Sequence, residues 1–332
     1  MSRNPERDLL QRLLSGPVSG DALAQASGQT RAAVWKRIEA LREAGVAIEA
    51  RPGRGYALAQ PLDLLDAESI FDAMAPMAKA GLSSLDVRWS VASTNTELLR
   101  TATTAGASVL LAERQTAGRG RRGRAWSSPL AANLYLSAAR TFDGGLARLG
   151  GLSLVAGVAV AEALQAIGVA GVALKWPNDI VVADGAGLRK LGGILVEGGG
   201  EHGGPVRAVV GIGLNVRMPD SAANSIDQPW SDLASVVGTS LPSRNVVAAA
   251  LVSSLLPALQ RFDEGGLDAF VDRFASFDVL HGREVVVHAH DGAHVGIALG
   301  IAGDGALRVR FEDGESNVHA GEVSVRSAGT HG

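Results

Sequence analysis

The chain has 332 residues, a formal net charge of −3 and a sequence pI near 6.2, which excludes a protein coated with nucleic acid over its whole surface. Hydrophobic residues make up 46% and aromatic residues only 4%, so we expect two or three domains with cores of alanine, valine and leucine. The absence of cysteine excludes disulfides, cysteine-ligated zinc and thiol catalysis, and it favours a reducing, cytoplasmic location.

The apolar segments of the sequence indicate neither a signal peptide nor a membrane span. The N-terminal residues lack the apolar core of a signal peptide. The most membrane-like run, residues 149–174, is interrupted by polar side chains and glycines. We therefore expect a buried helix followed by a strand in this run, and no membrane span.

Residues 1–62 are predicted to form a winged helix-turn-helix domain. Ser19 and Thr30 are suitable helix N-caps, and two short helices joined by a glycine-containing turn are typical of the motif. A basic Pro/Gly turn between two short strands is typical of a wing. The expected elements are, in order, helices at 7–14, 21–26 and 30–44 and strands at 46–50 and 56–58.

Charge favours DNA binding by this end of the chain. Residues 1–60 hold nine basic and six acidic side chains, a net charge of +3, which leaves −6 for the remainder. A helical bundle used for protein contacts is the alternative. The residues expected to contact DNA lie at the start of the third helix and in the wing: Thr30, Arg31, Trp35, Lys36 and Arg54.

The central region, residues 63–279, alternates between helical and strand patterns and is predicted to be an α/β domain whose sheet is mixed rather than doubly wound. The expected helices are 67–74, 93–101, 147–166, 244–263 and 267–275. The expected strands are 87–89, 109–112, 133–137, 172–176, 180–182, 191–197 and 206–215.

After Leu280 the pattern changes to short strands separated by Asp-Gly or Gly-rich turns. Strands are expected at 284–288, 293–298, 306–311 and 322–326. Their number and spacing predict a small β-barrel of SH3-like size over residues 280–328.

The most unusual stretch is the arginine loop, residues 118–124, in which three glycines and four arginines follow one another. Glycines permit close backbone approach and anion-holding turns, and arginines add fixed positive charge suited to phosphate or carboxylate. Such a loop repels itself, so we expect an anionic ligand to order it. A solvated basic surface loop is the alternative.

Three further clusters join this loop. A lysine-containing segment stops a strand at a proline, a lysine precedes an apolar strand, and a strand ends in a side-chain amide. They are Lys175-Trp176-Pro177-Asn178-Asp179, residues 189–197 and residues 211–216. Taken singly, each is weak evidence, because a lysine before an apolar strand is usually a surface residue.

In this order, and together with Ser93-Thr94-Asn95 and the arginine loop, the clusters closely resemble those of biotin protein ligases. The N-terminal domain further resembles that of the bifunctional ligases that also repress biotin genes. The resemblance covers essentially the whole chain, and it implies a central domain with a fold like that of the class II synthetases.

The resemblance implies a two-step acyl transfer. The carboxylate of biotin attacks the α-phosphate of Mg²⁺-bound ATP to give biotinyl-5′-adenylate, which is then opened by a lysine of a biotin carboxyl carrier protein. It also implies a homodimer when adenylate is bound, with the adenylate as co-repressor on operator DNA. Fixed cations suit this chemistry because two anions must meet.

Family roles are carried over to matching positions only. Lys190 and Arg121 match the catalytic residues, and no residue of the chain is assigned as a metal ligand. The positions that match the biotin site are Ser93, Thr94, Asn95, Gln115, Arg119, Gly120, Arg121 and Lys190. Those that match the ATP and adenylate site are Arg122, Trp126, Asn178 and Asn215.

Other interpretations remain open for several of these residues and for the chain. Trp126 would also suit a core, Asn95 a helix cap and Asp179 a turn. The segment before Lys190, residues 184–189, is longer than usual, so the path of that turn is not predicted. The chain as a whole could be a ligase only, with residues 1–62 a module that does not bind DNA, or a biotin sensor without ligase activity; Lys190 and the intact arginine loop count against the sensor.

Overall fold

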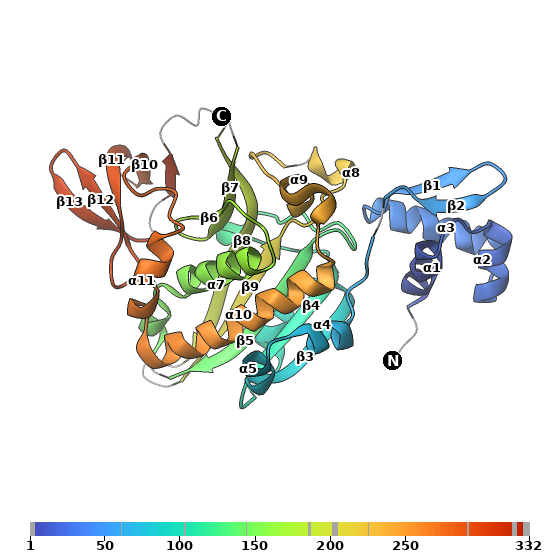
Figure 1. Cartoon of the computed structure of the whole chain (residues 1–332), viewed down its shortest axis with the longest axis horizontal. Coiled ribbons are helices and arrows are strands. Elements are labelled where there is room, and N and C mark those ends of the chain that lie inside the picture. The colour runs from blue at the N-terminus through green and yellow to red at the C-terminus, as the bar shows by residue number, and fades with distance from the viewer. Residues whose placement is uncertain are drawn as a thin grey trace.

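A computed structural model describes residues 4–60, 62–102, 104–143, 145–184, 187–200, 205–224, 226–290, 292–320 and 324–327. Three units follow one another along the long axis of the molecule (Figure 1). The N-terminal helices and wing lie at one end, the large sheet with its helices in the middle, and the C-terminal strands at the other end.

The N-terminal unit is the predicted winged helix-turn-helix. Ser19 and Thr30 cap their helices by accepting hydrogen bonds from Ala22 N and Ala33 N, and Asn4 caps the first helix, which sequence reasoning did not predict. The two wing strands pair antiparallel. The elements are α1 (Pro5–Leu14), α2 (Gly20–Ser27), α3 (Arg31–Glu43), β1 (Ile48–Arg51) and β2 (Gly55–Leu58).

The central unit is built on a seven-stranded sheet in the order β3-β4-β5-β9-β8-β7-β6. Only the β3–β4 pair is parallel among the described pairings, so the prediction of a mixed sheet is confirmed. The strands are β3 (Leu82–Val91), β4 (Ala107–Gln115), β5 (Leu134–Phe142), β6 (Val172–Lys175), β7 (Asp179–Asp184), β8 (Gly187–Gly200) and β9 (Val206–Leu214).

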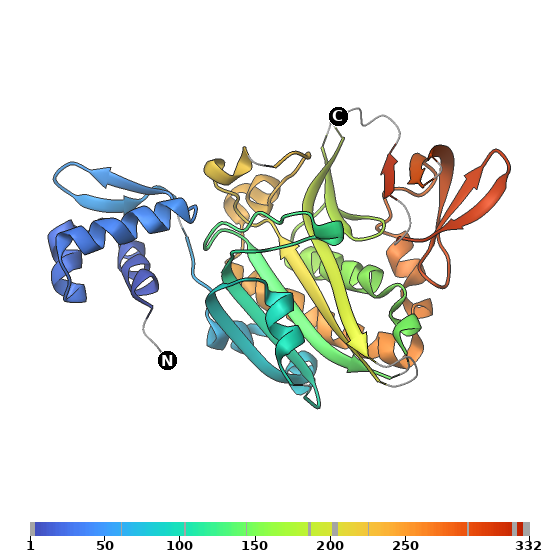
Figure 2. The same ribbon diagram turned by 180° about the vertical axis from the view of Figure 1, so that it is seen from behind.

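Helices cover both faces of this sheet. The two longest, α7 (Leu152–Ala166) and α10 (Arg244–Gly265), lie together over one face and bury most of the core (Figure 1). The short helix α6 (Thr94–Arg100) lies on the opposite face, against β4, β5 and β9 (Figure 2). The remaining helices are α4 (Ala67–Ala73), α5 (Pro76–Ala80), α8 (Asp220–Ala223), α9 (Leu233–Val237) and α11 (Asp268–Ala275).

The predicted helix at 147–166 is wrong at its start. A 3-10 turn covers Leu146–Leu149, and α7 begins only at Leu152. Gly151 precedes it with φ of 80°, a left-handed conformation, and the side chain of Leu267 covers it so closely that a Cβ would stand 2.7 Å from a methyl carbon. Helices α5, α8 and α9 were not predicted.

Within the described residues, α10 is long and apolar enough by composition to cross a membrane. More than half of its most apolar window is buried, and it packs on α7 and the sheet. These are the properties of a core helix.

The C-terminal unit is a five-stranded antiparallel sheet in the order β13-β12-β11-β10-β14. Four of its strands fall where they were expected, and β13 was missed because its sequence is mostly polar. The strands are β10 (Glu284–Ala289), β11 (Gly292–Ile301), β12 (Leu307–Phe311), β13 (Gly314–Val318) and β14 (Ser324–Ser327). Glu322 and Val323, the first two residues of the last expected strand, lie outside the described residues.

The N-terminal unit is bound to the central one through hydrogen bonds and apolar packing. Leu130 N donates to Ala44 O at 2.8 Å, and the side chains of Leu130 and Ala131 are buried in the core of the winged helix-turn-helix. The segment that follows the wing is also bound to the sheet, because Glu113 on β4 accepts a hydrogen bond from Leu65 N at 2.6 Å. The segment that follows the arginine loop therefore reaches the winged helix-turn-helix unit.

Candidate active site

A network of hydroxyl and amide groups lies where α6 begins. Gln115, at the end of β4, accepts through Oε1 from Thr94 N at 2.9 Å and from Thr94 Oγ1 at 3.2 Å. Ser137 Oγ on β5 lies 2.6 Å from both Thr94 Oγ1 and Asn95 Oδ1. Ser93 caps the helix by accepting from Thr96 N. Apart from the half-buried Gln115, these groups are buried, and they offer donors and acceptors to a small polar ring.

A carboxylate extends this network. Asn95 Nδ2 donates to Glu197 Oε2 at 2.8 Å and to Leu195 O at 3.2 Å, both on β8. The other oxygen of Glu197 accepts from Arg119 Nη2 at 2.9 Å. Gly211 on β9 lies directly under Asn95, where a Cβ would stand 2.3 Å from Asn95 Oδ1.

The arginine loop closes over the same face of the sheet. Trp126 N donates to Gly118 O, and Gly120 N donates to Arg124 O, so the loop is a hydrogen-bonded hairpin with a 3-10 turn at Arg121–Gly123. Arg122 has φ of 55°, and its side chain is exposed. The expectation that an anion orders this loop stays a prediction.

Arg121 points back into the protein from this loop. It donates to Asn178 Oδ1 at 3.2 Å and to Ala320 O in the C-terminal unit. Burial, and then the neighbouring charge of Arg122, lowers the pKa of the Arg121 guanidinium, while Asp179 opposes this shift. Arg121 therefore joins the loop, the sheet and the C-terminal unit.

Lys190 lies beside Arg121 and Trp126. Its Nζ is 2.7 Å from Asp179 Oδ1 and 5.7 Å from the centre of the Trp126 ring. Asp179 begins the strand β7 that pairs with the lysine's strand β8, and sequence reasoning had left it as a possible turn residue. The catalytic cation that the sequence predicts thus has an acid as its partner within the protein.

Trp126 lies on a floor of two glycines. A Cβ on Gly213 would stand 2.5 Å from its ring, and one on Gly193 would stand 3.5 Å from it. The indole Nε1 is buried and has no hydrogen-bond partner among the residues that the structure describes. An unpaired buried donor is costly, and a ligand acceptor at this place would satisfy it.

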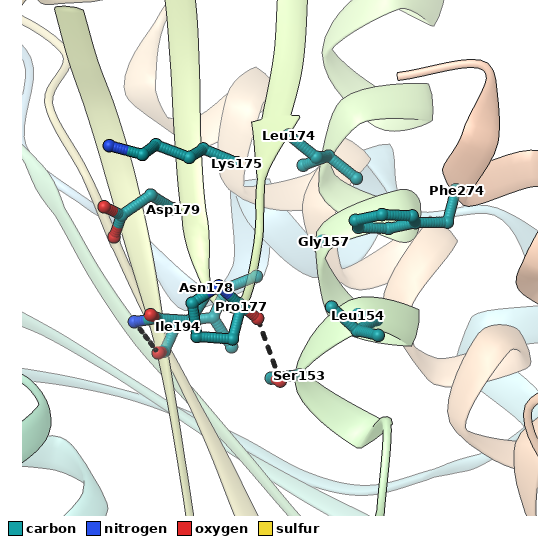
Figure 3. Close-up of a pocket in the computed structure, with 10 residues that line it drawn as sticks. All are labelled: Ser153, Leu154, Gly157, Leu174, Lys175, Pro177, Asn178, Asp179, Ile194 and Phe274. Atoms are coloured by element: carbon teal, nitrogen blue, oxygen red, sulfur yellow. Dashed lines mark hydrogen bonds between the residues drawn. The ribbon is translucent and has the colours of Figure 1, made fainter. Parts of the chain in front are cut away.

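The two asparagines of the predicted nucleotide site differ in their surroundings. Asn178 follows the turn at Pro177, where Ser153 Oγ donates to Pro177 O and Asn178 Nδ2 donates to Ile194 O (Figure 3). Asn215 is buried, and its Nδ2 donates to Ser231 O at 3.0 Å, which holds that segment against Lys190. The cavity behind Asn178 is only about 10 Å³, which leaves room for about one water molecule and no ligand.

The structure therefore brings the predicted residues into two neighbouring groups. One surrounds the start of α6 and includes Thr94, Asn95, Gln115 and Arg119. The other surrounds Lys190 and includes Arg121, Trp126 and Asn178. Sequence reasoning missed Ser137, Glu197 and the pairing of Lys190 with Asp179, because each depends on strand pairing between distant segments.

No group of three or more His, Cys, Asp and Glu side chains is placed to hold a metal ion in the described part of the chain. Asp179 is the acid nearest Lys190, and Mg²⁺ commonly binds through one or two carboxylates together with substrate phosphates. The donor set therefore fits a metal that arrives with a nucleotide.

The third helix α3 and the wing, which carry the predicted DNA-contacting residues, belong to the N-terminal unit at one end of the molecule (Figure 2). Trp35 is 54% exposed, and Lys36 and Arg54 are also exposed. Arg31 pairs with Asp21 at 3.1 Å, and both side chains are largely in solvent. Such a surface pair contributes little to stability, so the arginine can change partner at small cost.

Comparison with known proteins gives consistent matches along the chain. Residues 88–215 match the biotin/lipoate A/B protein ligase family, residues 6–57 match an HTH domain, and residues 280–326 match the biotin protein ligase C-terminal domain. The bifunctional ligase/repressor BirA of Salmonella typhimurium is 39% identical over 311 residues, which cover 93% of each chain.

A second relative and a solved structure also match this chain. A biotin–[acetyl-CoA-carboxylase] ligase of Mycobacterium tuberculosis is 34% identical over 268 residues, 78% of this chain and 95% of that one. Among solved structures, the biotin protein ligase from Aquifex aeolicus in complex with biotin and ATP has a TM-score of 0.62 and 28% identity, and the match covers 74% of this chain and 100% of that chain.

Proposed function

This chain belongs to the biotin protein ligase family, in its bifunctional ligase/repressor branch, and we propose that its site joins biotin to ATP and passes the activated biotin to a lysine of a carrier protein. One observation carries the assignment of the site: buried amides and hydroxyls at the start of α6 lie next to an arginine loop and a lysine that already form ion pairs. Neutral polar groups suit a ureido ring, and cations suit the carboxylate and phosphates.

The hydroxyl and amide network forms the biotin end of the proposed site. Ser137 holds the orientation of Thr94 and Asn95, and Thr94 in turn holds Gln115, so the ring meets donors and acceptors that are already in place. Ser93 fixes the start of the helix by accepting from Thr96 N, and Gly120 N donates to Arg124 O within the loop. Groups positioned in advance lose little entropy on binding.

Lys190 and Arg121 form the reacting end. The carboxylate oxygen of biotin attacks the α-phosphorus, a bond to the bridging oxygen breaks, and pyrophosphate leaves with the electron pair. In our proposal, the lysine leaves Asp179 for the oxygens on which charge develops, and Arg121 holds the adenylate phosphate. Arg122, Asn178 and Asn215 lie on the nucleotide side, and Trp126 stacks near the adenine.

Magnesium belongs to this proposal as the partner of the ATP phosphates, whose charge it neutralises. Asp179 is the carboxylate that would hold it. The carrier lysine then attacks the acyl carbon of the adenylate as a free amine, and AMP leaves. Closure of the arginine loop keeps water from the mixed anhydride.

In the repressor role, we propose that α3 and the wing contact operator DNA as half of a homodimer held together by biotinyl-adenylate. A single unit of charge +3 makes few phosphate contacts, so two copies on matched half-sites bind far better. We also propose a division at residues 62/63 and 279/280, and a cytoplasmic location, which fits a chain without cysteine.

The ligase assignment is tested by incubating the chain with biotin, ATP, Mg²⁺ and a biotin carboxyl carrier domain, and by following the mass of the carrier. We expect an increase equal to one biotin less one water. A carrier that keeps its mass with biotin but gains a lipoyl group from lipoate would contradict the proposal.

A further inference from the structure

Glu197 on β8 is an acidic side chain inside a site that is otherwise built to receive anions. It is about a quarter exposed and carries no role in the reaction proposed above. Its two oxygens have different partners: Oε2 accepts from Asn95 and Oε1 accepts from Arg119. A carboxylate in such a place disfavours anion binding, because like charges repel. A structural role for Glu197 would explain why an acid is found there.

The first reason is the orientation of the Asn95 amide. An amide can face either way, and its partners decide which atom is the donor. Glu197 Oε2 and Leu195 O are both acceptors, so the nitrogen of Asn95 must face β8. Its oxygen then faces Ser137 and the biotin end of the site.

The second reason is the position of the arginine loop. Arg119 forms an ion pair with Glu197 on β8. This strand lies inside the sheet, between β9 and β7. The loop otherwise rests on its own hairpin hydrogen bonds and on Arg121. Arg119 therefore gives the biotin-side part of the loop its attachment to the sheet.

We propose that Glu197 is a positioning residue that assembles the biotin end of the site by holding Asn95 and Arg119 with one carboxylate. It acts on biotin through these two side chains, before the reacting atoms meet. Its removal therefore raises KM for biotin and leaves kcat nearly unchanged. This inference rests on the proposed ligase function.

Two substitutions separate the two contacts. Glu197→Gln keeps an acceptor for Asn95 and removes the charge that holds Arg119. An exposed ion pair of this kind is worth up to about fivefold in an equilibrium constant, so we expect KM for biotin to rise about threefold. Glu197→Ala removes both contacts, and a lost buried hydrogen bond adds about tenfold more.

The matched control is Glu162→Gln. Glu162 on α7 accepts from Arg273 at 2.5 Å and is 34% exposed, so it is a partly exposed ion pair on the face of the sheet opposite to α6. The assay is biotin-dependent exchange of pyrophosphate into ATP with the full chain. We expect the control to match the unsubstituted chain in both KM and kcat.

A double-mutant cycle tests whether Glu197 acts through Arg119. In an Arg119→Ala background, Glu197→Gln should change KM by less than about twofold, because its partner is gone. Glu197→Ala should still raise KM there, through Asn95. Equal effects of both substitutions in both backgrounds would overturn the assignment of two separate contacts.

Trypsin gives a readout that needs no activity. Cleavage after the arginines of residues 119–124 in the ligand-free chain should be about threefold faster in Glu197→Gln, and unchanged in Glu162→Gln. A chain without biotin-dependent exchange would contradict the proposed function, while the trypsin rates would still decide whether Glu197 holds the loop. Unchanged cleavage together with unchanged KM would refute this inference.

Discussion

Removing the guanidinium of Arg244 should destabilise the central unit far more than removing a surface arginine. Arg244 and Glu113 are 3% and 2% exposed, and Arg244 Nη2 lies 2.8 Å from Glu113 Oε2. The same guanidinium donates to Asp63 O at 2.8 Å and to Asn133 O at 2.9 Å. Arg244→Met would leave a buried carboxylate and two backbone carbonyls without these donors.

The magnitude follows from what is left behind. Breaking a buried ion pair by removing one partner costs about 3–5 kcal/mol, because the remaining charge is uncompensated. At roughly 2–4 °C per kcal/mol for a domain of this size, the melting temperature should fall by about 6–20 °C. Arg88→Met breaks the exposed pair with Glu97 and should cost at most about 1 kcal/mol.

The assay is thermal unfolding of the ligand-free chain, followed by tryptophan fluorescence and circular dichroism, since units that unfold separately would give transitions that do not coincide. The double variant Glu113→Gln, Arg244→Met removes the uncompensated charge and should recover part of the loss. If Arg244→Met lowers the transition no more than Arg88→Met, the buried pair does not hold the linker to the sheet.

Three further predictions concern the proposed functions. Lys190→Ala should slow adenylate formation by about 10²–10³ but slow transfer from supplied biotinyl-adenylate much less; equal losses in both half-reactions would indicate a structural role. Arg121→Gly should keep the melting temperature within a few degrees and release activated biotin, measured as labelling of bystander lysines; a collapsed melting temperature would count against this. Replacing Arg31 and Lys36 together by alanine should weaken binding to operator DNA and flatten its salt dependence in gel shifts, leaving ligase activity intact; an unchanged salt slope would argue against phosphate contacts there.

Local patterns predicted the elements that have local causes. Ser19 and Thr30 cap their helices because their hydroxyls reach backbone donors three residues ahead, and this depends only on nearby sequence. The mixed sheet followed from the alternation of helices and strands. The start of α7 could not be predicted, because Gly151 takes its left-handed conformation beneath Leu267, a residue more than a hundred positions away.

The residues of the candidate site also divide into those that the sequence could indicate and those that it could not. Residues with an unusual local context, such as Lys190 and Arg121, could be singled out from the sequence through the family that they resemble. Ser137 and Glu197 stand in ordinary strand sequences, and only the pairing of β5, β9 and β8 brings them to Asn95. Their importance depends on register, which a single sequence does not specify outside short hairpins.

The glycine floor under Trp126 and Asn95 limits how the site can be redesigned. Gly193, Gly211 and Gly213 already have the smallest side chain, so no substitution of the floor can make more room above it. Any change there fills space: a methyl group on Gly213 would meet the indole ring at 2.5 Å. The side chain that can be cut back is Trp126 itself, which lies on the nucleotide side of the proposed site, so ATP analogues with an enlarged adenine should be accepted first by a Trp126→Ala variant, as biotin-dependent adenylate formation from such analogues would reveal.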